Sequence, residues 1–92
     1  ITIEADKKDV QMNLMNPEGN PCYFTFEIVL NDTDETIYTS KMVEPGKAIT
    51  EVALEKALAA GEYPATIKIT TASLTDGSAM NGANVETTLI AQ

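Results

Sequence analysis

The chain has 92 residues with fourteen acidic side chains, six lysines, no Arg and no His, which gives a formal net charge of −8. A chain of this length forms one domain with one core, so residues 1–92 are expected to fold as a single unit. The negative charge repels nucleic-acid phosphates and anionic lipids, and the absence of Arg removes the usual bidentate phosphate ligand. No apolar run approaches the roughly 18 residues that a membrane-spanning helix needs. The composition therefore argues against a nucleic-acid partner and against insertion of this segment into a membrane.

The residues needed for most catalytic and metal chemistry are missing. Without His, the chain cannot build a Ser-His-Asp or Cys-His catalytic group, and a single thiol, Cys22, cannot form an internal disulfide or a thiolate zinc site. Cys22 shares strand parity with Phe24, so it is expected to be a small buried apolar residue. Paired carboxylates of the glycosidase kind need a cleft, which a domain this small does not provide. We therefore expect no enzymatic activity, no catalytic residues and no cofactor.

Alternation of apolar and polar residues predicts seven short strands, in chain order over residues 1–3, 10–14, 22–31, 36–40, 48–54, 63–71 and 85–91. The clearest run places Phe24, Phe26, Ile28 and Leu30 on one face and mostly polar residues on the other. Such a pattern is typical of a half-buried antiparallel strand. Shared parity predicts one core that contains Phe24, Phe26, Ile28, Leu54, Leu58, Tyr63, Ile67, Ile69 and Leu89.

Turn-forming residues separate these strands. Residues 16–21 are dense in Asn, Pro and Gly, residues 31–34 read as a tight hairpin turn, and residues 44–47 carry Pro and Gly in succession. Asp76-Gly77 and Asn81-Gly82 are expected to bracket a longer loop before the last strand. Residues 54–60 are rich in helix formers and end before Gly61, so one short helical turn is expected there.

A tyrosine corner is predicted where this crossing segment enters the sixth strand. Leu58, Gly61 and Tyr63 resemble the L-x-x-G-x-Y stretch of immunoglobulin-like and fibronectin type III domains. In those domains the Tyr ring packs inward, and its hydroxyl bonds to backbone a few residues upstream. The immunoglobulin Cys pair and core Trp are absent, so the resemblance is to the fibronectin type III-like group. The expected fold is an all-β, seven-stranded antiparallel immunoglobulin-like sandwich with one short helical turn near residues 54–60.

A wider resemblance concerns the cellular location of the protein. Small uncharacterised proteins of Gram-positive gut bacteria, which look surface-associated or lipid-anchored, are similar to this chain over residues 16–24, 38–40, 44–49, 59–63, Leu74 and 81–82. The resemblance implies an extracellular or cell-surface location. It also implies a non-enzymatic interaction or structural module, with a protein or a cell-surface glycan as partner, and it transfers no activity.

Two places are candidates for ligand contact. Carbohydrate-binding sandwiches use exposed aromatic platforms, and Tyr23 and Tyr38 are the candidate ligand-surface residues if the domain is a carbohydrate-binding module. That alternative requires both rings to be exposed on one face. The oxygen-rich segment Asn31, Asp32, Asp34 and Glu35 is expected to be a solvated turn, with a Ca²⁺ site as the open alternative.

Overall fold

The computed structural model describes residues 1–79 and 82–92, and it contains a strand in each of the seven predicted places. The strands are β1 (Thr2–Ile3), β2 (Asp9–Met15), β3 (Cys22–Leu30), β4 (Glu35–Thr39), β5 (Ala48–Ala53), β6 (Gly61–Ser73) and β7 (Ala79–Ala91). The all-β prediction is therefore confirmed. In the part of the chain that the structure describes, no helix is long and apolar enough to cross a membrane.

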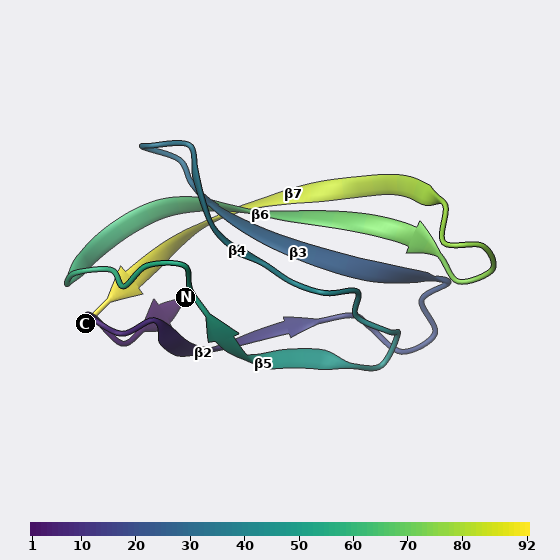
Figure 1. Ribbon diagram of the computed structural model, residues 1–92, viewed down its shortest axis with the longest axis horizontal. Helices are drawn as coiled ribbons and strands as arrows, with labels where there is room; N and C mark the ends of the chain where they lie inside the picture. Colours follow the sequence, from purple (N-terminus) through teal and green to yellow (C-terminus); the bar gives the residue numbers. More distant parts are fainter.

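The strands form two sheets, one of five strands in the order β1-β7-β6-β3-β4 and one made of β2 and β5. Figure 1 shows the pair β2–β5 lying below the long strands of the larger sheet. The prediction of a purely antiparallel fold is wrong at one place, because β1 pairs in parallel with the end of β7, with Ile3 opposite Ala91. A two-residue strand has no pattern that encodes direction, so only its long-range hydrogen bonds decide it.

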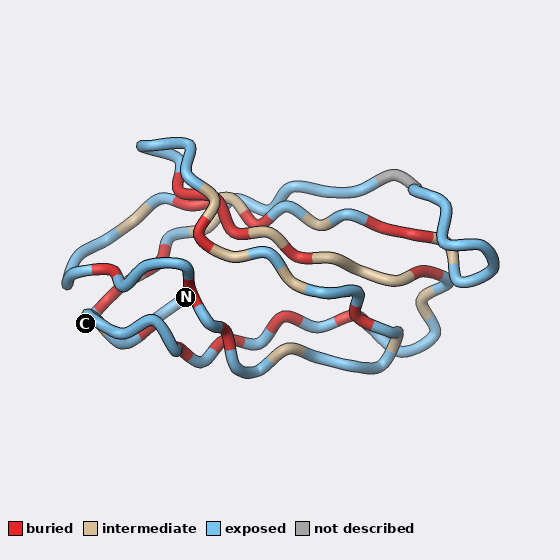
Figure 2. Tube along the Cα trace, in the orientation of Figure 1, coloured by how far each residue is buried: buried red, intermediate tan, exposed pale blue. Residues whose placement is uncertain are grey.

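The core lies between the two sheets. Val10, Leu14 and Val52 of the smaller sheet are buried against residues of the larger one, such as Phe26 and Ile28. The predicted core set is confirmed: six of its nine members are buried, and Phe24, Tyr63 and Ile69 are partly buried against them. Figure 2 shows the buried positions along the middle of the molecule and exposed residues at the hairpin tips. Cys22 is free and buried, as predicted.

One cross-strand row shows how far the smaller sheet covers the larger one. The row runs from Val85 on β7 through Ile67 and Ile28 to Tyr38 on β4. Relative exposure falls from 47% at Val85 to 7% at Ile67 and 0% at Ile28. The centre of the larger sheet is therefore buried, whereas the margin along β7 stays open to solvent.

The predicted helical turn at residues 54–60 is wrong. Its backbone groups bond to distant segments instead of to one another: the amide of Leu54 donates to Lys8 O (2.8 Å) and that of Glu55 to Ile37 O (2.8 Å). The carbonyl of Leu58 accepts from the Asp6 amide at 2.7 Å. A segment this short gains little from its own helical hydrogen bonds, so tertiary bonds and the burial of Leu54 and Leu58 decide its path.

The last strand is longer than predicted. It begins at Ala79, so the loop expected before Val85 shrinks to a tight hairpin, and Gly82 lies within the strand; Asn81 falls outside the described residues. The β6–β7 register shifts between Ile69 and Thr71. A Cβ at Gly82 would overlap the Ile69 carbonyl oxygen, so this Gly permits a close backbone approach at an irregular pairing rather than a turn.

Candidate functional site

The tyrosine corner forms as predicted. The Tyr63 hydroxyl donates a hydrogen bond to the carbonyl oxygen of Ala59 at 2.7 Å, and the ring is partly buried against the core. Gly61 has a φ of +154°, a conformation that residues with a side chain rarely adopt. The corner therefore joins the crossing segment to the start of β6, but its hydrogen bond remains accessible to solvent.

Tyr63→Phe is expected to lower the free energy of unfolding by about 0.5–1 kcal/mol, because it removes one hydrogen bond that water can partly replace. Gly61→Val is expected to cost more, about 2–3 kcal/mol, because Val must adopt a conformation reserved for Gly. Urea unfolding of both variants measures the two losses. A loss of less than a few tenths of a kcal/mol for Tyr63→Phe would show that the corner contributes nothing to stability.

A second structural feature was not foreseen. Asn16, which the sequence suggested only as a turn former, is fully buried. Its side-chain amide donates to Cys22 O (3.0 Å) and Val43 O (2.8 Å), and its side-chain oxygen accepts from Asn20 (2.9 Å). Its backbone amide donates to Lys47 O and its carbonyl accepts from Gly46. Asn16 thus joins two loops at the end of the sandwich where β3 begins.

The two candidate tyrosines lie on different sides of the larger sheet. Tyr38 is opposite Ile28, packs against the core, and is only partly exposed; burial raises its pKa. Tyr23 is opposite Ala72 and has the parity of Thr25, so it lies on the outer face. The structure does not bring the two rings together on one face.

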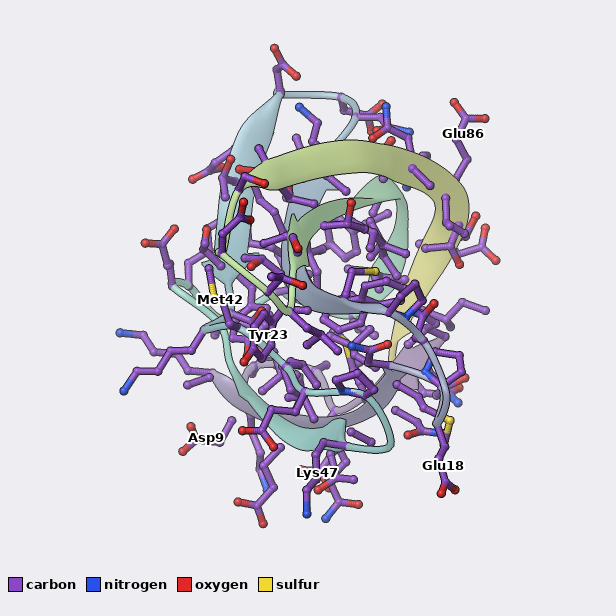
Figure 3. The ribbon with its side chains drawn as sticks, turned by 90° about the vertical axis from the view of Figure 1, so that its right-hand side faces the viewer. Asp9, Glu18, Tyr23, Met42, Lys47 and Glu86 are labelled. Carbon is purple, nitrogen blue, oxygen red and sulfur yellow. The ribbon has the colours of Figure 1, made fainter. Side chains whose placement is uncertain are left out.

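Another exposed residue does lie beside Tyr23. Phe24 and Val43 form an antiparallel bridge, with both backbone hydrogen bonds made, so Met42 is held next to the start of β3. Met42 is 58% exposed, and Figure 3 places it close to Tyr23 at the end of the sandwich that faces the viewer. Leu74, 44% exposed, follows the last residue of β6, which is opposite Cys22. We call Tyr23, Met42 and Leu74 the hairpin-end patch.

The oxygen-rich turn at residues 31–35 uses several of its oxygens within the protein. Asn31 Oδ1 accepts from Thr66 at 2.7 Å, and Glu35 pairs with Lys56 at 2.6 Å. Asp34 has a φ of +56°, as expected in a tight turn. The described residues contain no group of three or more acidic, His or Cys side chains arranged to hold a metal ion.

The grooves of the described surface are open and mixed in character. One of about 600 Å³ lies between the β1 region and β2, with Glu4, Lys7 and Asp9 along it. Glu4 and Lys7 form an exposed ion pair at 2.8 Å, which raises the Lys7 pKa. A smaller groove of about 320 Å³ lies beside the tyrosine corner, lined by Leu30, Leu58 and Tyr63 among others. Both grooves are open to solvent.

Comparison of the chain with protein-family models, with curated proteins and with solved structures gives no match. The functional assignment therefore depends on the residues and their arrangement.

Proposed function

We propose that the chain is an immunoglobulin-like interaction module of a bacterial surface protein, located outside the cytoplasm, without enzymatic activity. The observation that carries the proposal is the hairpin-end patch: an exposed Met beside a partly exposed Tyr, with an exposed Leu directly after the end of β6. Met and aromatic residues are enriched in protein–protein interfaces, where they provide adaptable apolar contacts. A protein on the cell surface is the proposed partner.

The strand arrangement supports the immunoglobulin-like part of the proposal. Strands β3, β6 and β7 are neighbours in one sheet and β2 and β5 form the other. Immunoglobulin-like domains likewise place their third, sixth and seventh strands in one sheet and their second and fifth strands in the opposite one. The Tyr63–Ala59 bond lies just where such domains have their tyrosine corner. Seven strands and 92 residues also fit the size of these domains.

The backbone beside the hairpin-end patch is held by buried hydrogen bonds. The Asn16 side chain fixes the backbone at Cys22 and Val43, which are neighbours of Tyr23 and Met42 in the chain. A preorganised surface loses little conformational entropy when a partner binds. The pair Tyr23 and Tyr38 gives less support to a carbohydrate platform, because their positions in the strand register place them on opposite faces.

The proposal is tested by photo-crosslinking on intact cells of the producing organism. A photoreactive residue at position 42 is expected to crosslink to a surface protein, whereas one at the exposed position 50 of β5 is expected not to. Tyr23→Ala is expected to weaken binding to cells by about tenfold or more, the scale of an aromatic hot spot. Its thermal unfolding, measured in parallel, checks that the fold is retained.

The rival outcomes are distinct. Binding that survives protease treatment of the cells and is competed by soluble surface polysaccharide would favour the carbohydrate-binding alternative. Equal crosslinking from positions 42 and 50, or unchanged binding after Tyr23→Ala, would contradict the assignment of the hairpin-end patch.

A further inference from the structure

The edge of β7 is an exposed strand margin of the larger sheet. On its free side, β1 pairs only with Ile90 and Ala91, and over residues 82–88 no described strand lies beside it. Figure 1 shows β7 as the uppermost strand of the larger sheet along the right half of the molecule. An unpaired edge presents free backbone donors and acceptors that can add another strand.

The hydrogen bonds to β1 show which residues of β7 direct their backbone outward. The Ile1 amino group donates to Thr88 O at 3.1 Å, and Ile90 N donates to Ile1 O at 2.7 Å. Successive residues of a strand alternate between its two neighbours, and the β6–β7 register is unbroken from Ala83 to Ala91. The amides and carbonyls of Asn84 and Glu86 therefore point away from β6, toward solvent.

Other strand margins carry protective features that β7 lacks between Ala83 and Thr88, where its pairing with β6 is regular. Strand β1 has two residues, β4 has five and a register shift, and the β2–β5 pair is also irregular. Short strands, bulges and charges are the usual protection of sheet edges. Residues 82–88 contain a single charged side chain, Glu86, and no Pro or Lys.

We propose that the β7 edge binds the β7 edge of a second copy of this chain, antiparallel, around a two-fold axis at Val85. In this register, Asn84 of one copy pairs with Glu86 of the other, and each such pair exchanges two backbone hydrogen bonds. The two Val85 side chains, each 47% exposed, meet across the axis and cover one another. The pairing is limited to residues 83–87 of each copy, because Ile1 already uses the outward carbonyl of Thr88 and β1 lies beside Ile90 and Ala91. This inference goes beyond the proposed function and does not depend on it.

Charge favours this register over its neighbour. Glu86 lies on the outer face, opposite Thr66, and Asn84 lies opposite Lys68. With the two-fold axis at Val85, each Glu86 lies next to the uncharged Asn84 of the other copy. It then lies on the same outer face as Lys68 of that copy. Centring the axis at Glu86 would place two carboxylates directly opposite each other, which is unfavourable. Figure 3 shows Glu86 pointing away from the body of the domain, free to make such contacts.

The long-range charge opposes association. Each copy carries a net charge of −8, and added salt screens that repulsion over about 10 Å at 0.1 M ionic strength. The interface of a single edge pair is small, so a weak, reversible dimer is expected. Its affinity is expected to increase as NaCl is added.

Sedimentation equilibrium at several protein concentrations and at low and high NaCl tests the proposal. Val85→Lys places two ammonium groups across the axis, and Glu86→Pro removes an outward amide that β6 does not use. Each is expected to weaken the dimer by about tenfold or more, equivalent to about 1.4 kcal/mol. Met15→Lys, also at an exposed apolar residue but on β2, away from the β7 edge, is the matched control and is expected to dimerise like the wild type.

All three substitutions raise the net charge by one unit. A loss of dimer affinity seen only in the two edge variants therefore cannot come from net charge. Circular dichroism checks that each variant is folded. If Val85→Lys does not fold, Glu86→Pro still tests the proposal. A wild-type chain that stays monomeric at high salt and high concentration would overturn the proposal. So would a dimer that the edge variants weaken no more than Met15→Lys does, or one that dissociates as salt is added.

Discussion

Asn16→Ala is expected to lower the free energy of unfolding by about 2–4 kcal/mol, a large part of the stability of a small domain. The substitution removes the donor of two buried hydrogen bonds, to Cys22 O and Val43 O, and the acceptor of the Asn20 amide. Val43 O keeps its bond from the Phe24 amide, which limits the loss. Urea unfolding measures the change. Asn13→Ala, at an exposed Asn of β2, the strand that ends just before Asn16, is the control and should cost little.

Asn16→Asp tests the same site by pH. A carboxylate at this buried position would face the carbonyl oxygens of Cys22 and Val43, so the charged form is disfavoured and the folded-state pKa of the new Asp is raised. A group with a raised folded-state pKa contributes stability below its unfolded pKa of about 4 and loses it as pH rises. The stability deficit of Asn16→Asp relative to wild type should therefore grow from about pH 4 to pH 7. A deficit that does not change with pH would show that position 16 is hydrated.

Ile28→Ala is expected to destabilise the fold by about 3–4 kcal/mol, because it leaves a cavity at a fully buried position between the two sheets. Val85→Ala is the matched control. Val85 points to the same face in the same cross-strand row, but it is 47% exposed, so its truncation is expected to cost less than about 1 kcal/mol.

Thermal or urea unfolding of the two variants compares the covered centre of the sheet with its open margin. Similar losses at both positions would contradict the arrangement in which β2 and β5 cover the centre of the larger sheet but leave β7 open around Val85. The comparison is made on purified monomer at low salt, where association through the β7 edge is weakest.

Local patterns predicted much of the fold. All seven strands follow from period-two alternation, and the core follows from the parity of residues such as Phe26 and Ile28. The corner was also predictable, because Gly61 and Tyr63 have roles that depend on local geometry. Each of these features depends on residues that lie within a few positions of one another in the sequence.

Features that depend on distant segments were not predictable. The parallel pairing of β1 is decided by bonds to residues nearly ninety positions away. Residues 54–60 have helix-forming side chains, yet their backbone groups are taken up by Lys8, Ile37 and Asp6. Gly82 resembled a turn residue because the close approach of Ile69 is invisible in the sequence. Asn16 looked like any turn Asn, since its burial depends on two loops that meet around it.

The candidate site was predictable only in part. Tyr23 could be assigned to the outer face by parity, but Tyr38 could not, because the register shift between Ile28 and Val29 places it opposite a core residue. Met42 lies outside the regular strands, and only its bridge-forming neighbour, Val43, places it beside β3. Side chains between strands do not alternate regularly, so the sequence pattern could not assign Met42 to a surface.

The central claim is the two-sheet arrangement with the first strand parallel to the last, since every surface proposed above depends on it. Nuclear Overhauser contacts of the isotope-labelled protein in solution test it most directly. We expect parallel-strand contacts from Ile3 to Ala91, antiparallel contacts from Phe26 to Ile69, and contacts between the side chain of Val52 and the β3–β6 face. Contacts that pair β1 with β2 in one sheet, or a helical pattern over residues 54–60, would contradict it.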